Sequence, residues 1–240
     1  MIVSILIGRK NSKGFPGKNL VKINNKHLFQ YPLEASINSR KIDKTFVCTD
    51  DTKINNISIK KGAIKIPRPK YLSTDAALGE DVFEFSYKFI KEKINKKISL
   101  IVLLFCNTLC VNSKNLDKAI NIINKKKDID SIVSVSKYNM WSPLRARKIN
   151  DKGFLKPFVE FEYFGDPKKL NCDRDSQGDV WFADMGFSIV KPRCLENMKN
   201  GLLPQKWMGK NIYPYKQEGG FDIDYEWQLE SLKYWNKKFN

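Results

Sequence analysis

The segment MIVSILI (residues 1–7), followed by GRKNSKGFPGKN (residues 8–19), decides the fold. Its first part is an almost continuous apolar run, which is typical of a strand buried on both faces of a parallel sheet. Its second part combines three glycines with four cations, namely Arg9, Lys10, Lys13 and Lys18. Ligands of open α/β sheets bind beyond the carboxyl ends of the strands, so the loop is a candidate anion site. A solvated turn is the alternative, which the density of glycine and positive charge disfavours.

Apolar runs and amphipathic segments alternate along the first half of the chain. Strands are predicted at 2–7, 45–49, 63–66, 99–105 and 131–136. Helices are predicted at about 28–38, 52–61, 79–94 and 113–126. This alternation predicts the α/β fold class, with a mainly parallel central sheet and helices on both faces.

The pattern changes after about residue 137. Residues 137–182 are rich in aromatic side chains, glycine and proline. Short strands are predicted at 144–149 and 186–190, and a helix at about 225–236. Because no low-complexity linker separates the two halves, we expect a single domain over residues 1–240, whose second half adds a lobe over the sheet.

Composition narrows the function classes. The net charge of +17 invites a nucleic-acid interpretation, but the Lys-rich pieces are spread along the chain and no recognition motif accompanies them, so nucleic acid is disfavoured as a partner. Five cysteines without CxxC spacing and a single histidine predict neither a disulfide framework nor a zinc site. The longest apolar run, at 98–106, is too short to span a bilayer, and the N-terminus does not resemble a signal peptide. We therefore expect a cytoplasmic protein without membrane association.

A second polar motif lies near the C-terminus, in FDID (residues 221–224). Asp222 and Asp224 flank one isoleucine, so both carboxylates face the same side if the segment is extended. Paired carboxylates that act with substrate phosphates are the usual protein ligands of Mg²⁺ in nucleotide chemistry. The alternative is that Asp224 caps the following helix. For a weaker acidic pair, Asp50 and Asp51, helix capping is at least as good an interpretation as metal binding.

The segment ILIGRKNSKGFPGKNL (residues 5–20) resembles the opening signature of the acylneuraminate cytidylyltransferases (the CMP-sialic acid synthetase family), I-P-A-R-x-G-S-K-x-x-P-x-K-N. The matching residues are Arg9, Ser12, Lys13, Pro16, Lys18 and Asn19, and the departures are Ile7, Gly8 and Asn11. The resemblance implies that this loop, Gly8 and Ser12 included, binds the nucleotide. It assigns catalytic phosphate contacts to Arg9, Lys13 and Lys18, and places Asn19 on the cytosine side.

The resemblance extends over nearly the whole chain. It includes FVCTDD (46–51), RPKYLSTDAALGEDV (68–82), SIVSV (131–135), ADMGFSIV (183–190) and the FDID metal motif. It implies a Rossmann-like nucleotidyltransferase fold. It also implies that Arg68 frames the base, and that Gly79 or Leu78 stands where the family often has serine.

The sugar side of the predicted site departs from the family. Family members usually carry L-Q-P-T-S-P-L-R where this chain has LFCNTLCVN (104–112), so Phe105 replaces a glutamine and Val111 an arginine. Asn107 or Thr108 could supply a substitute hydrogen bond, and Gly186 belongs to a Met-Gly that replaces the family's Asn-Gly. Arg174 resembles an arginine that holds the sugar carboxylate. The alternatives to Arg174 are Arg145 and Arg147.

The resemblance implies a Mg²⁺-dependent enzyme that joins CTP and a sialic-acid-like 2-keto-3-deoxy sugar acid, giving a CMP-sugar and pyrophosphate. It also implies a homodimer, with residues 137–182 as the dimerisation and substrate lobe. The alternatives within enzymes are a Kdo-type acid as the sugar, or UTP or GTP as the nucleotide. An alternative of another class is a non-catalytic relative that binds nucleotides or nucleic acid.

Overall fold

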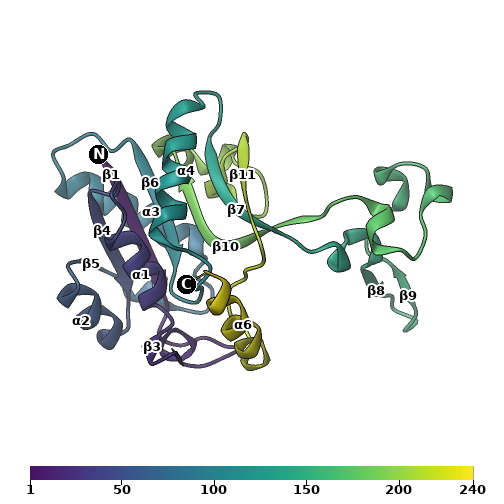
Figure 1. Ribbon diagram of the computed structural model, residues 1–240, viewed down its shortest axis with the longest axis horizontal. Coiled ribbons are helices and arrows are strands. Elements are labelled where there is room, and N and C mark those ends of the chain that lie inside the picture. The colour runs from purple at the N-terminus through teal and green to yellow at the C-terminus, as the bar shows by residue number, and fades with distance from the viewer. Residues whose placement is uncertain (240) are drawn as a thin grey trace.

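The structure, a computed structural model, describes residues 1–239 and is built around a seven-stranded sheet of order β11-β7-β10-β6-β1-β4-β5 (Figure 1). The strands are β1 (Ile2–Gly8), β4 (Lys44–Thr49), β5 (Ile64–Pro67), β6 (Leu100–Phe105), β7 (Ser131–Lys137), β10 (Trp181–Val190) and β11 (Ile212–Gln217). The helices are α1 (Gln30–Ile37), α2 (Thr52–Lys60), α3 (Gly79–Lys93), α4 (Ser113–Lys125), α5 (Pro192–Glu196) and α6 (Leu229–Phe239).

The sheet is mainly parallel, as the sequence predicts. Strand β1 pairs in parallel with β4 and β6, and β5 and β11 add parallel strands at the two edges. Only β10 runs against its neighbours, pairing antiparallel with both β6 and β7. The carboxyl ends of β1, β4 and β6 therefore lie at one edge, where a ligand site is expected.

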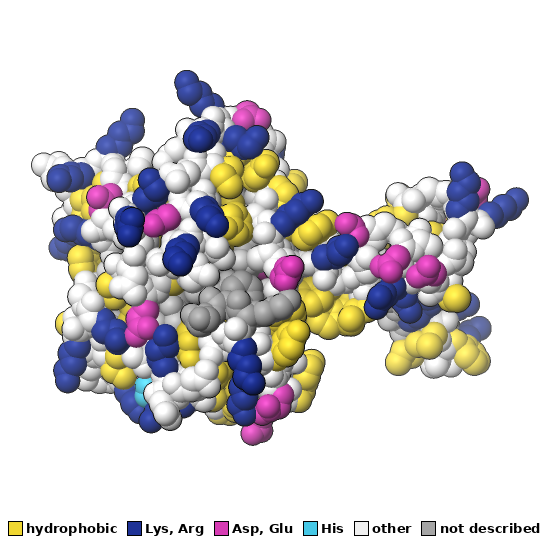
Figure 2. Space-filling view, in the orientation of Figure 1, with side chains coloured by type: hydrophobic (Ala, Val, Ile, Leu, Met, Phe, Trp, Pro, Cys, Tyr) yellow, Lys and Arg dark blue, Asp and Glu magenta, His cyan; other side chains and the backbone are white. Residues whose placement is uncertain are grey.

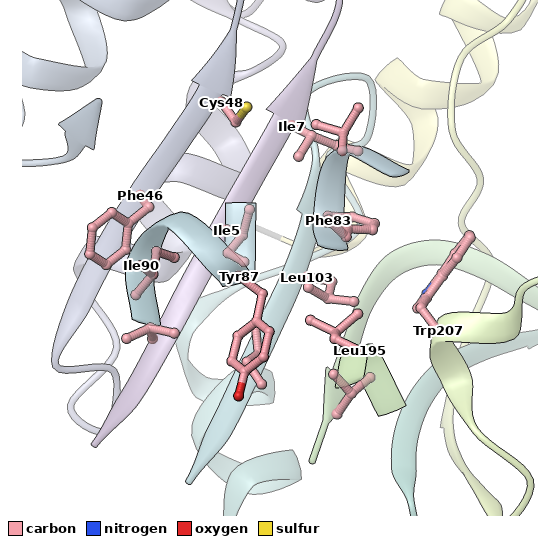
Figure 3. Close-up of a cluster of buried hydrophobic side chains, with 14 of the residues drawn as sticks. Ile5, Ile7, Phe46, Cys48, Phe83, Tyr87, Ile90, Leu103, Leu195 and Trp207 are labelled. Atoms are coloured by element: carbon pink, nitrogen blue, oxygen red, sulfur yellow. The ribbon is translucent and has the colours of Figure 1, made fainter. Parts of the chain in front are cut away.

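Helices cover both faces of the sheet. On one face, α3 and α5 pack on Ile5, Phe46 and Leu103, and Figure 3 shows how Phe83, Tyr87 and Leu195 close this core. On the other face, α1, α2 and α4 pack on Leu6, Val47 and Val102. Both expectations of the α/β fold class, parallel strands and two-sided helical cover, are thus confirmed.

A third, smaller core lies beside the sheet and is called the side core below. Its buried members are Ile23, Leu28, Tyr31, Leu109, Cys110, Ile223 and Leu232. It joins three distant segments: the turn after the 8–19 loop, the loop after β6, and the C-terminal segment with α6. Leu232 lies on α6, so this helix holds the FDID segment against the body of the protein.

Residues 138–180 form an arm that projects from the body (Figure 1). It contains the short hairpin of β8 (Arg147–Ile149) and β9 (Leu155–Pro157), so the strand predicted at 144–149 is present only in its second half. The sequence predicts a lobe over the sheet, whereas the arm extends away from it.

The strand predicted at 186–190 begins earlier, at Trp181, and β11 is not predicted. Among residues 1–239, no helix has the length and apolar character needed to cross a bilayer.

Candidate active site

A cavity of about 290 Å³ opens at the carboxyl ends of β1 and β6. Because parallel strands end at the same edge, the loops that follow them meet there. Nine of the residues predicted to bind nucleotide or sugar line this cavity: Gly8, Arg9, Ser12, Lys18, Asn19, Arg68, Gly79, Phe105 and Asn107. Ile7, Leu78, Ala77 and Val82 complete its wall, and the last two are not predicted from the sequence.

Two cations of the 8–19 loop share one carboxylate. Arg9 Nη1 lies 2.8 Å from Asp75 Oδ1 and donates to the Thr74 carbonyl at 2.9 Å. Lys13 Nζ lies 3.4 Å from Asp75 Oδ2, and its side chain is 73% exposed and does not line the cavity. Asp75 thus holds both cations of the loop. No sequence signal distinguishes Asp75 from other surface acids.

Arg68 and Asn19 brace the loop from the inside. Arg68 Nη1 donates to the Gly8 carbonyl at 3.1 Å, and its Nε donates to the Leu72 carbonyl at 3.1 Å. Burial lowers the pKa of the Arg68 guanidinium. Asn19 is buried, and its Nδ2 donates to the Arg9 carbonyl at 2.9 Å. Both side chains therefore fix the backbone at the start of the 8–19 loop, which carries the cations.

The two aspartates of FDID are oriented by the isoleucine between them. Ile223 is fully buried in the side core, so its neighbours on an extended backbone turn the other way. Asp222 is half-buried, and its Oδ2 accepts a hydrogen bond from Asn107 Nδ2 at 3.0 Å. Burial, and then the charge of Asp224, raises the pKa of the Asp222 carboxyl. Asn107 also donates to the Ile223 carbonyl at 3.0 Å, so its amide holds the motif in place.

Lys18 joins the loop to the FDID motif. Its Nζ lies 2.5 Å from Asp224 Oδ1 and also donates to the Ile223 carbonyl, and its side chain is only 11% exposed. Gly14 completes the junction, because a Cβ there would lie 2.5 Å from the Asp224 carbonyl oxygen. Only glycine allows so close an approach. Residues 206 positions apart thus form one surface.

The structure also decides the two capping interpretations. Asp224 pairs with Lys18, and the turn that leads into α6 has Tyr225 at its N-cap. Asp51 does cap a helix, since its side chain accepts hydrogen bonds from Lys53 N at 2.8 Å and Ile54 N at 3.0 Å at the start of α2.

The donor set at FDID fits Mg²⁺ only in part. Within residues 1–239, no group of three or more His, Cys, Asp and Glu side chains comes together to hold a metal. Asp222 and Asp224 offer carboxylate oxygens close to Lys18, one of the cations of the 8–19 loop. Mg²⁺ commonly takes one or two carboxylates and completes its shell with water and substrate phosphates. The residues therefore fit a metal that arrives with a nucleotide.

The other sugar-side predictions lie away from the cavity. Thr108 is fully buried, and Gly186 lies in β10, where a Cβ would approach the Cys110 carbonyl oxygen to 2.7 Å. Arg174 lies on the arm and pairs with Asp175 at 3.5 Å. Arg145 and Arg147 are also on the arm, beside a second hollow of about 520 Å³. Within one chain, none of these three arginines lines the cavity.

The family profile described as cytidylyltransferase matches residues 3–151, which include the 8–19 loop and every other residue that lines the cavity. The chain belongs to the cytidylyltransferase family. The resemblance noted in the sequence is thereby confirmed. FDID, β10 and residues 152–180 of the arm lie beyond the matched residues.

Curated relatives of this cytidylyltransferase act on sugar acids. It is 27% identical over 159 residues to a Helicobacter pylori protein named pseudaminic acid cytidylyltransferase and UDP-2,4-diacetamido-2,4,6-trideoxy-beta-L-altropyranose hydrolase, covering 66% of this chain and 30% of that protein. It is 27% identical over 185 residues to the Escherichia coli N-acylneuraminate cytidylyltransferase, covering 76% of this chain and 42% of the relative. The chain thus spans less than half the length of either relative.

Solved structures share the fold of this cytidylyltransferase. A CMP:2-keto-3-deoxy-manno-octonic acid synthetase complexed with CTP superposes with a TM-score of 0.67 at 15% identity, covering 99% of this chain and 98% of that one. A 4-diphosphocytidyl-2C-methyl-D-erythritol synthase from Anaerococcus prevotii superposes with a TM-score of 0.64 at 10% identity, covering 98% and 96% of the two chains. At such identities the likeness concerns the fold, and it confirms the predicted nucleotidyltransferase architecture.

Proposed function

We propose that this cytidylyltransferase joins CTP and a sialic-acid-like 2-keto-3-deoxy sugar acid. In this reaction the anomeric hydroxyl oxygen of the sugar forms a bond to the α-phosphorus, the bond from the α-phosphorus to the bridging oxygen breaks, and pyrophosphate leaves with that oxygen. The hydroxyl proton passes to solvent. The observation that carries the proposal is the contact of Lys18, which lines the cavity, with Asp224, which does not line it; the contact joins the cationic loop to the paired carboxylates.

The residues of the loop act by position and charge. Arg9 and Lys18 line the cavity and meet the triphosphate, while the exposed Lys13 reaches it from the rim. Preorganised cations at the phosphates stabilise the charge that develops there in the transition state. Phosphoryl and nucleotidyl transfer need little covalent help from a protein, which accounts for a site without a histidine or cysteine nucleophile.

The proposed cofactor is Mg²⁺, held by Asp222 and Asp224. When bound, it supplies a Lewis-acid charge that is shared by the carboxylates and the phosphate oxygens. Asn107 orients the Asp222 carboxylate for this role through its 3.0 Å hydrogen bond. Asp224 is available once Lys18 turns from it toward a phosphate.

The proposed assembly is a homodimer, and its proposed location is the cytoplasm. The arm exposes many large apolar side chains for so small an element: Met140, Trp141, Ile149, Phe154, Leu155, Phe158, Tyr163 and Phe164. Exposed apolar patches of this kind mark interaction surfaces. The proposed role of Arg145, Arg147 or Arg174 on the sugar carboxylate requires that the arm of one chain reaches the cavity of the other.

The test is a pyrophosphate-release assay with Mg²⁺, each of the four nucleoside triphosphates, and a panel of sialic-acid-like and Kdo-like acids. We expect turnover with CTP and a nine-carbon acid, and loss of turnover when EDTA removes the metal. Turnover with UTP or GTP but not CTP would refute the nucleotide assignment. Turnover with an eight-carbon acid alone would move the proposal to the Kdo type.

The non-catalytic alternative makes opposite predictions. A nucleic-acid-binding protein with a net charge of +17 would bind DNA or RNA with a steep dependence on salt concentration. Its binding would be unaffected by Asp222→Asn, whereas the proposed enzyme loses turnover on that change. One variant therefore separates the two classes.

A further inference from the structure

A second buried carboxylate lies outside the cavity, in the middle of β10. Asp184 is 2% exposed and occupies an irregular stretch, because the pairing of β10 with β7 shifts register between Ala183 and Ser188. The next residue, Met185, has a φ of 57°, a left-handed conformation that is uncommon for a residue with a side chain. Something must hold this bulge in place.

The Asp184 carboxylate makes four hydrogen bonds. Its Oδ1 accepts from Ser134 Oγ at 2.5 Å and from the Gly186 amide at 3.0 Å. Its Oδ2 accepts from Ser136 Oγ at 2.7 Å and from Gln217 Nε2 at 2.9 Å. Four donors fill the acceptor capacity of a carboxylate. In the described part of the chain no Lys or Arg pairs with it, and burial raises its pKa.

These bonds tie together three segments that carry predicted site residues. Gln217 Nε2 also donates to the Cys110 carbonyl at 3.1 Å, in the loop that follows β6. Gly186 packs against the same carbonyl, since a Cβ there would lie 2.7 Å from it. Gly220 is close as well, where a Cβ would lie 2.8 Å from the Cys110 Cβ and 3.5 Å from Asp184 Oδ2. Two residues beyond Gly220 is Asp222, whose carboxylate meets Asn107.

We propose that Asp184 is a positioning residue that fixes the β10 bulge and the 217–222 segment, and through them the sugar-acid side of the site and the Asp222 carboxylate. The proposal rests on the proposed function. Asp184 does not line the cavity, so it acts through its neighbours. If Asp184 had a purely structural role, replacing it would lower the stability of the protein and the folded fraction. It would not change the KM for one substrate more than the KM for the other.

The test compares Asp184→Asn with Ser131→Ala in the full chain. In Asp184→Asn an NH₂ group replaces one oxygen and faces two donors, although the shape is kept. Ser131 is the control, because it is a fully buried hydroxyl at the far end of β7, the strand that carries Ser134 and Ser136, and its Oγ donates to the Met208 carbonyl instead of to Asp184. Gln217→Leu is the second variant, for the case that Asp184→Asn does not fold, and it removes the hydrogen bonds that link β11 to Asp184 and to the Cys110 carbonyl.

Two measurements decide the proposal. Hydrogen exchange should become faster in residues 183–188 and 217–222 of Asp184→Asn or Gln217→Leu, but not of Ser131→Ala. The KM for the sugar acid should rise about 10-fold or more while the KM for CTP changes less than about 2-fold, since small misplacements of reacting groups are costly. Exchange that matches the control, or equal changes in both KM values, would overturn the proposal. If the wild type turns over no sugar acid, the proposed function fails, and the exchange comparison still decides the role of Asp184.

Discussion

Lys18 Nζ lies 2.5 Å from Asp224 Oδ1, so a residue of the first loop that lines the cavity forms an ion pair with a residue near the C-terminus. The Lys18 side chain is only 11% exposed and also bonds to the Ile223 carbonyl, whereas the Asp224 side chain is 60% exposed. In the proposed function, the triphosphate would compete with Asp224 for the same ammonium group. Nucleotide binding and release of Asp224 for a metal are therefore expected to occur together.

Replacing Lys18 tests this relationship. Lys18→Ala should lower kcat/KM about 100-fold, the usual loss when a preorganised charge at a reacting phosphate is removed. The matched control is Lys10→Ala, a change of equal charge at an exposed residue of the same loop that does not line the cavity. Circular dichroism should show both variants folded. Equal effects of the two changes would mean that loop charge in general, not the position of Lys18, matters.

Phe105 is expected to set the choice of sugar. Its ring lines the cavity and packs edge-on against Phe83, with ring centres 5.3 Å apart. Phe105→Gln, which restores the residue implied by the family resemblance, should change the ratio of kcat/KM for two sugar acids about 10-fold. The KM for CTP should stay nearly constant. The control is Phe85→Leu, at a half-buried aromatic of the same core that does not line the cavity. An unchanged ratio would place Phe105 outside the sugar contacts.

The hairpin of the arm should carry part of the dimer contact. Ile149 and Leu155 are cross-strand partners, so their side chains share one face, and they are 73% and 68% exposed. Leu155→Asp should shift the mass measured by analytical ultracentrifugation toward the monomer. Lys156→Asp, on the opposite face of the same strand, is the control. A dimer that survives Leu155→Asp and dissociates in Lys156→Asp would assign the contact to the other face.

Glu34 should make the stability of the fold depend on pH. Burial opposes its ionisation, but hydrogen bonds from Lys61 at 2.8 Å and Lys26 at 2.9 Å outweigh burial and hold the pKa of Glu34 below its ordinary value. A lowered pKa in the folded state stabilises the protein above the unfolded pKa, and this contribution is lost as the pH falls through the folded value. Glu34→Gln should cost about 1 kcal/mol at neutral pH.

Urea denaturation at a series of pH values measures this contribution. The difference in free energy of unfolding between wild type and Glu34→Gln should shrink once the pH falls below the ordinary glutamate pKa of about 4.3, and it should disappear below the lowered pKa of the folded state. Glu92→Gln, at an exposed residue of α3, serves as the control. A difference that persists in acid would show that Glu34 acts by packing and not by charge.

The sheet could be predicted from the sequence because its strands have strong, local signals. Buried runs such as Ile2–Gly8 and Leu100–Phe105 are apolar throughout, and the helices between them have a clear apolar stripe. Strand β11 lacks this signal. It is an edge strand with Pro214 and alternating exposure, and a proline in a short run argues against a strand. The arm buries little of its own surface, so no periodic pattern marks it.

Individual residues of the site could be predicted from the sequence, but the contacts between them could not. Arg9, Lys18, Asp222 and Asp224 stand out because glycine-rich cationic loops and paired carboxylates have recognisable chemistry. That Lys18 touches Asp224, or that Asp75 holds Arg9 at 2.8 Å, depends on how loops distant in the chain meet. The role of Asp184 could not be predicted, because the sequence shows only a single aspartate in an apolar run. Its four hydrogen-bond donors come from separate segments and are seen around it only in the folded structure.

The side core has a consequence for how the protein opens. It is much smaller than the two cores that flank the sheet, yet it alone buries Ile223 between the two aspartates. Small cooperative units exchange with open forms at lower free energy than the whole fold. Limited proteolysis should therefore cut near α6 while the strands remain intact, and a bound nucleotide should protect that cut. On heating, the enzyme would then lose activity at a lower temperature than the one at which its secondary structure unfolds.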